Sequence, residues 1–202
     1  MNKISEYQQR IEQALKDKHY GANPKELYEP IRYIMSLGGK RLRPVLVCLG
    51  CDFFGEPFEK AMHAALAIEI FHNFTLVHDD LMDNAPLRRN QQTVHEKWNG
   101  NTAILVGDAM VIAAYQELNK LDAKYLPELI SVFSQTALQV CEGQQLDMNY
   151  EKAQKVSIQH YLKMIELKTA VLVGASLKMG AIIGNAREED ANSLYDFGKH
   201  IG

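Results

Sequence analysis

Residues 58–83 read FEKAMHAALAIEIFHNFTLVHDDLMD, a stretch in which apolar side chains predominate and no proline or glycine intervenes. Pro57 precedes the stretch, and the turn-forming segment Asn84-Ala85-Pro86 follows it. Apolar residues recur within it at helical spacing, without the alternation that marks a half-buried strand. The sequence therefore predicts one long helix that carries an acidic cluster at its C-terminal end.

Helical periodicity extends outward from this stretch over nearly all of the chain. Asn23, Pro24 and Glu26 predict an N-cap, a first helical residue and a capping box for a helix that ends at Gly38-Gly39. Further helices are predicted for an N-terminal segment with a buried stripe of Ile4, Tyr7, Ile11 and Leu15, and for residues 43–54, 101–119, 124–149, 157–184 and 188 to about 200. No linker or repeat divides them, so we expect a single all-α domain over residues 1–202.

The bulk composition excludes several classes of protein. The net charge is −3, with acids and bases mixed along the chain, so we expect neither nucleic-acid binding nor stable membrane insertion. Residues 169–186 are the most apolar stretch, but they contain Lys178 and several glycines, which favours a core helix over a membrane span. The N-terminus has no signal-peptide core, and we expect a cytoplasmic protein.

Cys48 and Cys51 form a C-x-x-C, a spacing found in redox motifs and in zinc sites. No second C-x-x-C or histidine pair at ligand spacing is present to complete a zinc site. Both cysteines lie within the apolar run PVLVCLGCDFF. Two buried thiols on one helix are therefore the favoured interpretation.

The acidic cluster places like charges together. Asp79 and Asp83 are four residues apart and share one face of the predicted helix, where their carboxylates repel each other. A compensating cation is expected, and it could be a lysine or arginine from a neighbouring helix or a divalent metal ion. Among metals, all-oxygen ligands favour Mg²⁺, which completes its shell with water and phosphate oxygens. Arg88 and Arg89 follow the helix, and their guanidinium groups match phosphate oxygens.

A second basic cluster occurs in GGKRLRP, which places Lys40, Arg41 and Arg43 after a glycine pair and before another helix. Such glycines allow the backbone to approach a ligand closely, and the basic side chains could hold a second anion. His72 lies seven residues before Asp79 and on the same helix face. Together the clusters suggest two anionic substrates, one bound through metal and one bound directly.

The chain resembles the all-trans polyprenyl diphosphate synthases, the family that includes farnesyl and geranylgeranyl diphosphate synthases. The resemblance rests on five segments in the family's order: GGKRLRP, HNFTLVHDDLMDNAPLRR, TAILVGDAM, GQQLDMNYE and ELKTAVL. It implies an isoprenoid-synthase-type bundle of long, mostly antiparallel helices around a central cavity. It also implies a homodimer and a Mg²⁺-dependent prenyltransferase whose substrates are isopentenyl diphosphate and an allylic prenyl diphosphate.

The resemblance also implies roles for individual residues. Asp79 and Asp83 would hold Mg²⁺ against the allylic diphosphate, Asp80 would orient this motif, and Arg88 would bind the same diphosphate. The residues expected to bind isopentenyl diphosphate are Lys40, Arg43, His72 and Arg89. Those expected to contact the allylic diphosphate and stabilise the developing cation are Lys168 and Thr169, with Gln144 and Asp147 as the polar lining of the cavity.

Product length should depend on residues that precede Asp79 on its helix. Phe74 is five residues earlier, or roughly 7.5 Å deeper at the rise of ~1.5 Å per residue, and Thr75 is four residues earlier. A bulky ring at Phe74 would stop the growing chain, although an ordinary core phenylalanine is equally consistent. By resemblance, the product is expected to be C15–C20, with geranylgeranyl diphosphate preferred.

The resemblance fails in one respect: the second aspartate-rich motif of the family is missing after Lys168. We therefore expect the 202 residues to be a C-terminally truncated synthase, inactive or weakly active by themselves. The alternative is a non-catalytic subunit that binds prenyl diphosphates or a partner. The metal, diphosphate and Lys168-Thr169 motifs favour the first interpretation.

Overall fold

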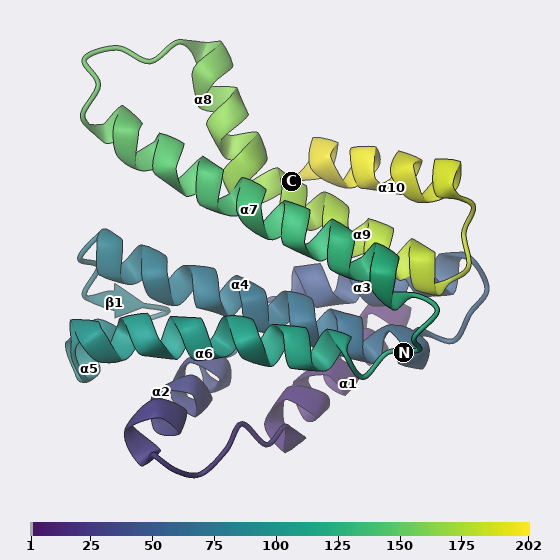
Figure 1. Cartoon of the computed structure of the whole chain (residues 1–202), viewed down its shortest axis with the longest axis horizontal. Coiled ribbons are helices and arrows are strands. Elements are labelled where there is room, and N and C mark those ends of the chain that lie inside the picture. The colour runs from purple at the N-terminus through teal and green to yellow at the C-terminus, as the bar shows by residue number, and fades with distance from the viewer. Residues whose placement is uncertain (1) are drawn as a thin grey trace. The chain divides into compact units, whose positions relative to one another are not determined.

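A computed structural model describes residues 2–202, and helices account for nearly all of the regular structure in them (Figure 1). The chain divides into two compact units, each built from two separate stretches of sequence. Unit 1 comprises residues 2–42 and 66–120, and unit 2 comprises residues 43–65 and 121–202. The all-α fold class expected from the sequence is confirmed.

The elements of unit 1 are α1 (Lys3–Asp17), α2 (Lys25–Ser36), most of α4 (Met62–Met82), β1 (Leu87–Arg88), β2 (Gln91–Gln92), α5 (Val94–Lys97) and α6 (Gly100–Leu118). The elements of unit 2 are α3 (Leu42–Phe53, from its second residue onward), η1 (Phe58–Ala61), α7 (Leu126–Glu151), α8 (Ile158–Ile165), η2 (Glu166–Ala170), α9 (Val171–Ile183) and α10 (Glu188–Ile201). The predicted long helix after Pro57 is thus formed by η1 and α4.

Helix α4 ends in a hydrogen-bonding pattern that its last residues explain. The amide of Ala85 donates to the carbonyl oxygen of Asp80 at 2.9 Å, and the amide of Asn84 donates to that of Leu81 at 3.3 Å. Asn84 has a φ of 50°, a left-handed conformation that asparagine adopts more readily than most residues. This Schellman-type end stops the helix within the acidic motif, so that Asp83 is the first residue after it.

The loop that follows α4 contains a tight hairpin, which the sequence did not predict. Arg88 of β1 lies opposite Gln91 of β2, which leaves Arg89 and Asn90 as the two turn residues. Their φ values of 53° and 62° are those of a type I′ turn, the connection whose twist suits a two-residue hairpin. The hairpin fixes the backbone of both arginines next to the acidic end of α4.

Helix α9 is the centre of unit 2. Its side chains are buried on every face except at Lys178, as expected for a helix that is apolar all round. It packs against α7 and α10 (Figure 1). It also meets α3 backbone to backbone, because a Cβ added at Gly50 would lie 2.5 Å from the carbonyl oxygen of Leu177.

The helix predicted over residues 157–184 is interrupted by η2, a π-helical turn. The amide of Val171 donates to the carbonyl oxygen of Glu166, five residues back, where an α-helix would use the residue four back. Such turns hold an extra residue and are frequent at functional sites. Lys168 and Thr169 both lie within η2.

The first two helices differ from the prediction in detail. Helix α2 begins at Lys25, and Pro24 occupies the N-cap position with extended dihedral angles and no side-chain cap. The predicted cap at Asn23 and capping box at Glu26 are therefore wrong, because proline, with its fixed φ, takes the last position before the helix. In α1, Ile4 is 45% exposed, while the other three residues of the predicted stripe are buried.

The C-x-x-C cysteines behave as core residues. Cys48 and Cys51 are both buried on α3 and carry free thiols, as predicted. Burial raises the pKa of Cys48 to about 12 and that of Cys51 to about 11. Throughout residues 2–202, no helix combines the length and the apolar character needed to cross a bilayer.

Candidate active site

The three aspartates at the end of α4 lie in different environments. Asp80 is 1% exposed, Asp79 is half-buried and Asp83 is exposed. Both carboxylate oxygens of Asp80 accept hydrogen bonds from Nε of Arg88, at 2.9 and 2.8 Å, and Nη2 of Arg88 lies 2.7 Å from Oδ1. The hairpin therefore returns Arg88 to the acidic motif, where it neutralises the innermost carboxylate.

The electrostatics of Arg88 reflect all three carboxylates. Its hydrogen bonds to Asp80 raise the pKa of the guanidinium against the effect of burial, and Asp79 and Asp83 raise it further. Arg88 therefore lies in the field of all three carboxylates, of which Asp79 and Asp83 are the more exposed. These two positions are the more accessible to an additional cation.

The donor set at Asp79 and Asp83 suits Mg²⁺. The amide of Asp83 donates to the carbonyl oxygen of Asp79 at 2.8 Å, which continues the helical geometry and keeps the residues one turn apart. Among the described residues, no group of three or more histidine, cysteine, aspartate or glutamate side chains could hold a metal by itself. Two partly solvated carboxylates fit Mg²⁺, which retains waters and takes phosphate oxygens as its other ligands.

Unit 1 also brings Arg89 to the glycine pair before α3. Nη1 of Arg89 donates to the carbonyl oxygen of Gly38, and a Cβ added at Gly39 would lie 3.1 Å from Nη2 of Arg89. Gly38 and Gly39 have φ values of 72° and 153°, a backbone that other residues adopt only with strain. Lys40 follows directly and is exposed, so two of the predicted isopentenyl diphosphate residues lie on one loop surface.

Arg89 is exposed, and charges of both signs act on it. Desolvation and the charges of Arg41 and Arg88 lower the pKa of its guanidinium, while the charges of Glu69 and Glu12 raise it. As an exposed cation, Arg89 is accessible to an anionic ligand. The loop that carries the glycine pair, together with Arg89, is therefore chemically suited to phosphate.

Arg41 does not join this surface, contrary to the expectation that all three basic residues of GGKRLRP could hold an anion. It is 3% exposed, and its guanidinium lies 2.7 Å from Oε1 of Glu12 and 2.5 Å from Oε1 of Glu69. Asn73 donates to the same carboxylate of Glu69 at 3.0 Å. Arg41 is therefore part of a buried polar network inside unit 1.

The predicted product-length residues lie on α4, before the aspartates. The ring of Phe74 is 4.8 Å from that of His78 and 5.4 Å from that of Phe71, measured between centroids. Oγ1 of Thr75 donates to the carbonyl oxygen of His72 at 2.8 Å. Phe74 is therefore held within a row of rings along this helix, and His72 lies half-buried two residues before it.

The remaining predicted residues belong to unit 2. Nζ of Lys168 lies 2.6 Å from Oδ2 of Asp147, which links η2 to α7 by an ion pair. Gln144 is 9% exposed on the same stretch of α7, and Thr169 is half-buried in η2. Arg43 lies at the start of α3 and is half-buried.

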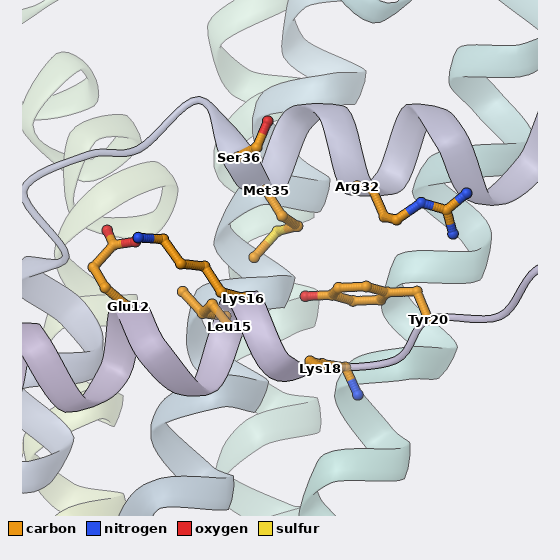
Figure 2. A pocket seen from close by; sticks show the side chains of 8 residues that line it. All are labelled: Glu12, Leu15, Lys16, Lys18, Tyr20, Arg32, Met35 and Ser36. Carbon is orange, nitrogen blue, oxygen red and sulfur yellow. The ribbon is translucent and has the colours of Figure 1, made fainter.

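Two hollows lie away from the predicted site residues. The first has a volume of about 270 Å³, lies in unit 1 against α1 and α2, and receives the hydroxyl of Tyr20 (Figure 2). That hydroxyl is buried with no hydrogen-bond partner in the described chain. The second has a volume of about 280 Å³ and lies in unit 2 against α7, α9 and α10. Neither hollow is lined by a predicted site residue.

Comparisons with known proteins identify the family and the fold of the chain. A family model described as Polyprenyl synthetase matches residues 24–202. A geranylgeranyl diphosphate synthase of Methanosarcina mazei is 42% identical over 181 residues, which cover 89% of this chain and 56% of that protein. A crystal structure of a geranylgeranyl pyrophosphate synthase superposes with a TM-score of 0.97 at 48% identity, covering 100% of this chain and 62% of that one. The corresponding protein of Geoglobus acetivorans gives a TM-score of 0.90 at 38% identity, covering 98% and 64%.

The fold is therefore the all-α fold of the isoprenoid synthases. The chain belongs to the polyprenyl synthetase family, as the five ordered motifs indicated. It spans about three-fifths of the length of the relatives that it matches.

Proposed function

We propose that the chain is part of a prenyltransferase that condenses isopentenyl diphosphate with an allylic prenyl diphosphate. The observation that carries the proposal is the pairing of two clusters in unit 1: Asp79 and Asp83 beside Arg88, and Arg89 beside the glycine pair and Lys40. The first suits a metal-bound diphosphate and the second suits a diphosphate bound directly. The names of the relatives, geranylgeranyl diphosphate synthases, support the same chemistry.

The allylic substrate is assigned to the acidic cluster. Asp79 and Asp83 would hold Mg²⁺, which on binding neutralises the diphosphate and assists its departure. Arg88 would bind the same diphosphate through the guanidinium edge that Asp80 leaves open. Asp80 is thereby proposed as the residue that holds Arg88 in place rather than as a metal ligand.

Isopentenyl diphosphate is assigned to the second cluster. The residues proposed to bind it are Lys40, Arg43, His72 and Arg89. The main support is the position of Arg89, whose guanidinium donates to the carbonyl oxygen of Gly38 beside the exposed Lys40.

The reaction requires a stabilised allylic cation. When the allylic C–O bond breaks, its electron pair leaves with the diphosphate, and the double bond of isopentenyl diphosphate attacks the cation. Loss of a proton, for which the released diphosphate is the proposed acceptor, restores an alkene. Lys168 and Thr169 would stabilise the charges that develop, and Gln144 and Asp147 would supply polar lining.

The product is proposed to be a C15–C20 all-trans prenyl diphosphate, with geranylgeranyl diphosphate preferred. Phe74 supports a short product because its ring is packed against two neighbouring rings and cannot swing aside freely. The active form is proposed to be a cytoplasmic homodimer. Its support is the apolar outer face of α6, on which Ile104, Leu105 and Ile112 are 48%, 57% and 59% exposed.

The test begins with the intact mass of the protein isolated from its host. The isolated protein is then incubated with isopentenyl diphosphate, farnesyl diphosphate and Mg²⁺, and the products are sized. A Mg²⁺-dependent C20 product that is lost in Asp79→Ala would support the proposal, and a product beyond C20 would contradict the chain-length assignment. Mg²⁺-dependent diphosphate binding without any product would instead favour a non-catalytic binding or partner subunit.

A further inference from the structure

Within unit 2, helix α7 meets the π-helical turn η2 at a glycine. A Cβ added at Gly143 would lie 2.6 Å from Cα of Lys168 and 2.7 Å from the carbonyl carbon of Leu167, and closer still to the amide nitrogen of Lys168. Real Cβ atoms essentially never approach other atoms this closely. The obstructing atoms are backbone atoms, which cannot rotate out of the way as a flexible side chain could. Only glycine fits at this position of α7 without moving η2.

The residue one turn further along α7 binds the same lysine through its side chain. Asp147 follows Gly143 by four residues and lies on the same helix face. Its Oδ2 is 2.6 Å from Nζ of Lys168, and the two side chains are 32% and 24% exposed. One face of α7 therefore contacts Lys168 at two places. Gly143 contacts its backbone, and Asp147 contacts its ammonium group.

The π-helical turn explains why this support is needed. A π turn has no intrinsic preference over the α-helix, so neighbouring contacts must stabilise its extra residue. The contact at Gly143 involves the backbone of the turn itself, at the residue whose side chain is proposed to stabilise the allylic cation. A displacement of η2 would move Lys168 and Thr169 together.

We propose that Gly143 and Asp147 are positioning residues that together form the seat of Lys168. Gly143 admits the backbone of η2, and Asp147 fixes the direction of the ammonium group. This assigns Asp147 a role on Lys168 in addition to the polar lining of the cavity proposed above. The inference deepens the proposed function and rests on it for the kinetic measurement alone.

The first measurement does not depend on activity. The rate at which a small amine-reactive ester acetylates Lys168 is followed by tandem mass spectrometry of the peptide between Glu166 and Glu188, in which fragment ions distinguish Lys168 from Lys178. Asp147→Asn removes the ion pair, and Gly143→Ala displaces η2, so each is expected to raise the acetylation rate of Lys168 about fivefold, the scale of a partly exposed ion pair. Lys178 serves as the internal reference within the same protein.

Gly50→Ala is the matched control. A Cβ there would also press against backbone, 2.5 Å from the carbonyl oxygen of Leu177, but at the contact between α3 and α9. It should lower the thermal stability to a similar extent and leave the acetylation of Lys168 unchanged. The comparison separates a general loss of packing from displacement of η2.

The second measurement is kinetic and uses the isolated natural protein and its variants. Gly143→Ala and Asp147→Asn should each lower kcat by on the order of tenfold to a hundredfold, the cost of misplacing a reacting group by about 1 Å. KM for isopentenyl diphosphate should stay within twofold of that of the unaltered protein in both, and the double variant should be little worse than either single one, because both act through Lys168.

The outcomes separate the two proposals. If both variants raise the acetylation rate of Lys168 but the protein shows no turnover, the positioning role of Gly143 and Asp147 is supported and the proposed prenyltransferase function is contradicted. If the protein turns over substrate but the acetylation rate of Lys168 is unchanged in both variants, or is raised equally in Gly50→Ala, the positioning role of Gly143 and Asp147 is wrong. Should Gly143→Ala fail to fold, Asp147→Asn decides the question, because it adds no atoms to the α7–η2 contact.

Discussion

At the scale of single residues, two aspartates of the acidic motif at the end of α4 have different roles. Asp80 is buried and gives both carboxylate oxygens to Arg88, whereas Asp83 is exposed beyond the helix end. Removing the charge of Asp80 leaves the half-buried guanidinium of Arg88 without its strongest partner. Removing the charge of Asp83 relieves repulsion between carboxylates and disturbs no packing.

We therefore predict that Asp80→Asn lowers the free energy of unfolding by about 1–3 kcal/mol, whereas Asp83→Asn changes it by less than about 0.5 kcal/mol. Urea unfolding of the two variants measures the difference. Asp83→Asn should nonetheless abolish most of the Mg²⁺-dependent turnover, because one of the two proposed metal ligands is lost. Equal stabilities of the two variants would contradict the structural role given to Asp80.

The buried thiols give the stability a dependence on pH. In the folded chain the pKa values of Cys48 and Cys51 are about 12 and about 11, above the ordinary value of about 8.5 for an unfolded thiol. Between these values the unfolded chain binds fewer protons than the folded chain, so the stability falls as the pH rises above about 9. The loss should reach about 1–2 kcal/mol for each thiol by pH 10.

Urea unfolding at pH 8, 9 and 10 measures this loss. Lysines and tyrosines titrate in the same range, so the control is the Cys48→Ala/Cys51→Ala variant. Its stability should be lower at pH 8, because core volume is removed, but should fall less steeply with pH. Parallel pH profiles for the two proteins would show that the thiols do not contribute.

At the scale of elements, the hairpin after α4 uses an uncommon turn pair. A type I′ turn requires positive φ at both turn positions, and glycine is the favoured residue at the second. Asn90, with a φ of 62°, occupies that position. We predict that Asn90→Gly leaves the stability unchanged or raises it by up to about 1 kcal/mol, whereas Asn90→Val lowers it by about 1 kcal/mol or more. Thermal unfolding compares them, and a more stable valine variant would contradict the type I′ turn.

Patterns that repeat along the chain were readable from the sequence, and single tertiary contacts were not. The all-α fold and most helix boundaries followed from apolar periodicity and from glycine or proline at the ends. The hairpin was missed because Arg89-Asn90 is not one of the usual turn pairs. The π turn was missed because η2 lies in a long helical stretch where one extra residue leaves no mark on the pattern.

For the candidate site too, sequence patterns were predictable and single tertiary contacts were not. The sequence identified the acidic and basic clusters, because charge spacing is visible without a fold. It did not show that Arg41 turns inward, since this depends on Glu12 and Glu69, which lie 29 and 28 residues away along the chain. Nor did it separate Asp80 from Asp79, because only the returning hairpin gives Asp80 its partner.

At the scale of the whole molecule, the outer face of α6 is the proposed dimer surface. Its exposed residues recur at helical spacing, and three of them are large and apolar. We predict that Ile112→Glu converts the dimer to a monomer, because a charge without a partner in an apolar interface costs several kcal/mol. Sedimentation velocity measures the change. The control is Ile158→Glu, because Ile158 on α8 is an equally apolar side chain that is 78% exposed and lies outside the proposed dimer surface. A dimer that persists in Ile112→Glu would contradict the assignment of the surface.

The division of the chain into units that each use two separate stretches has a consequence during synthesis on the ribosome. Helix α3 packs against α9 through Gly50, and α9 is translated about 130 residues later, which at ~5–20 residues per second is a delay of roughly 7–26 seconds. During that delay the face of the nascent α3 that carries Gly50 lacks its contact with α9, while all of the sequence of unit 1 has been translated once α6 and the two residues after it are made. The order of translation therefore favours completion of unit 1, which carries the two proposed diphosphate clusters, before unit 2, which carries Lys168.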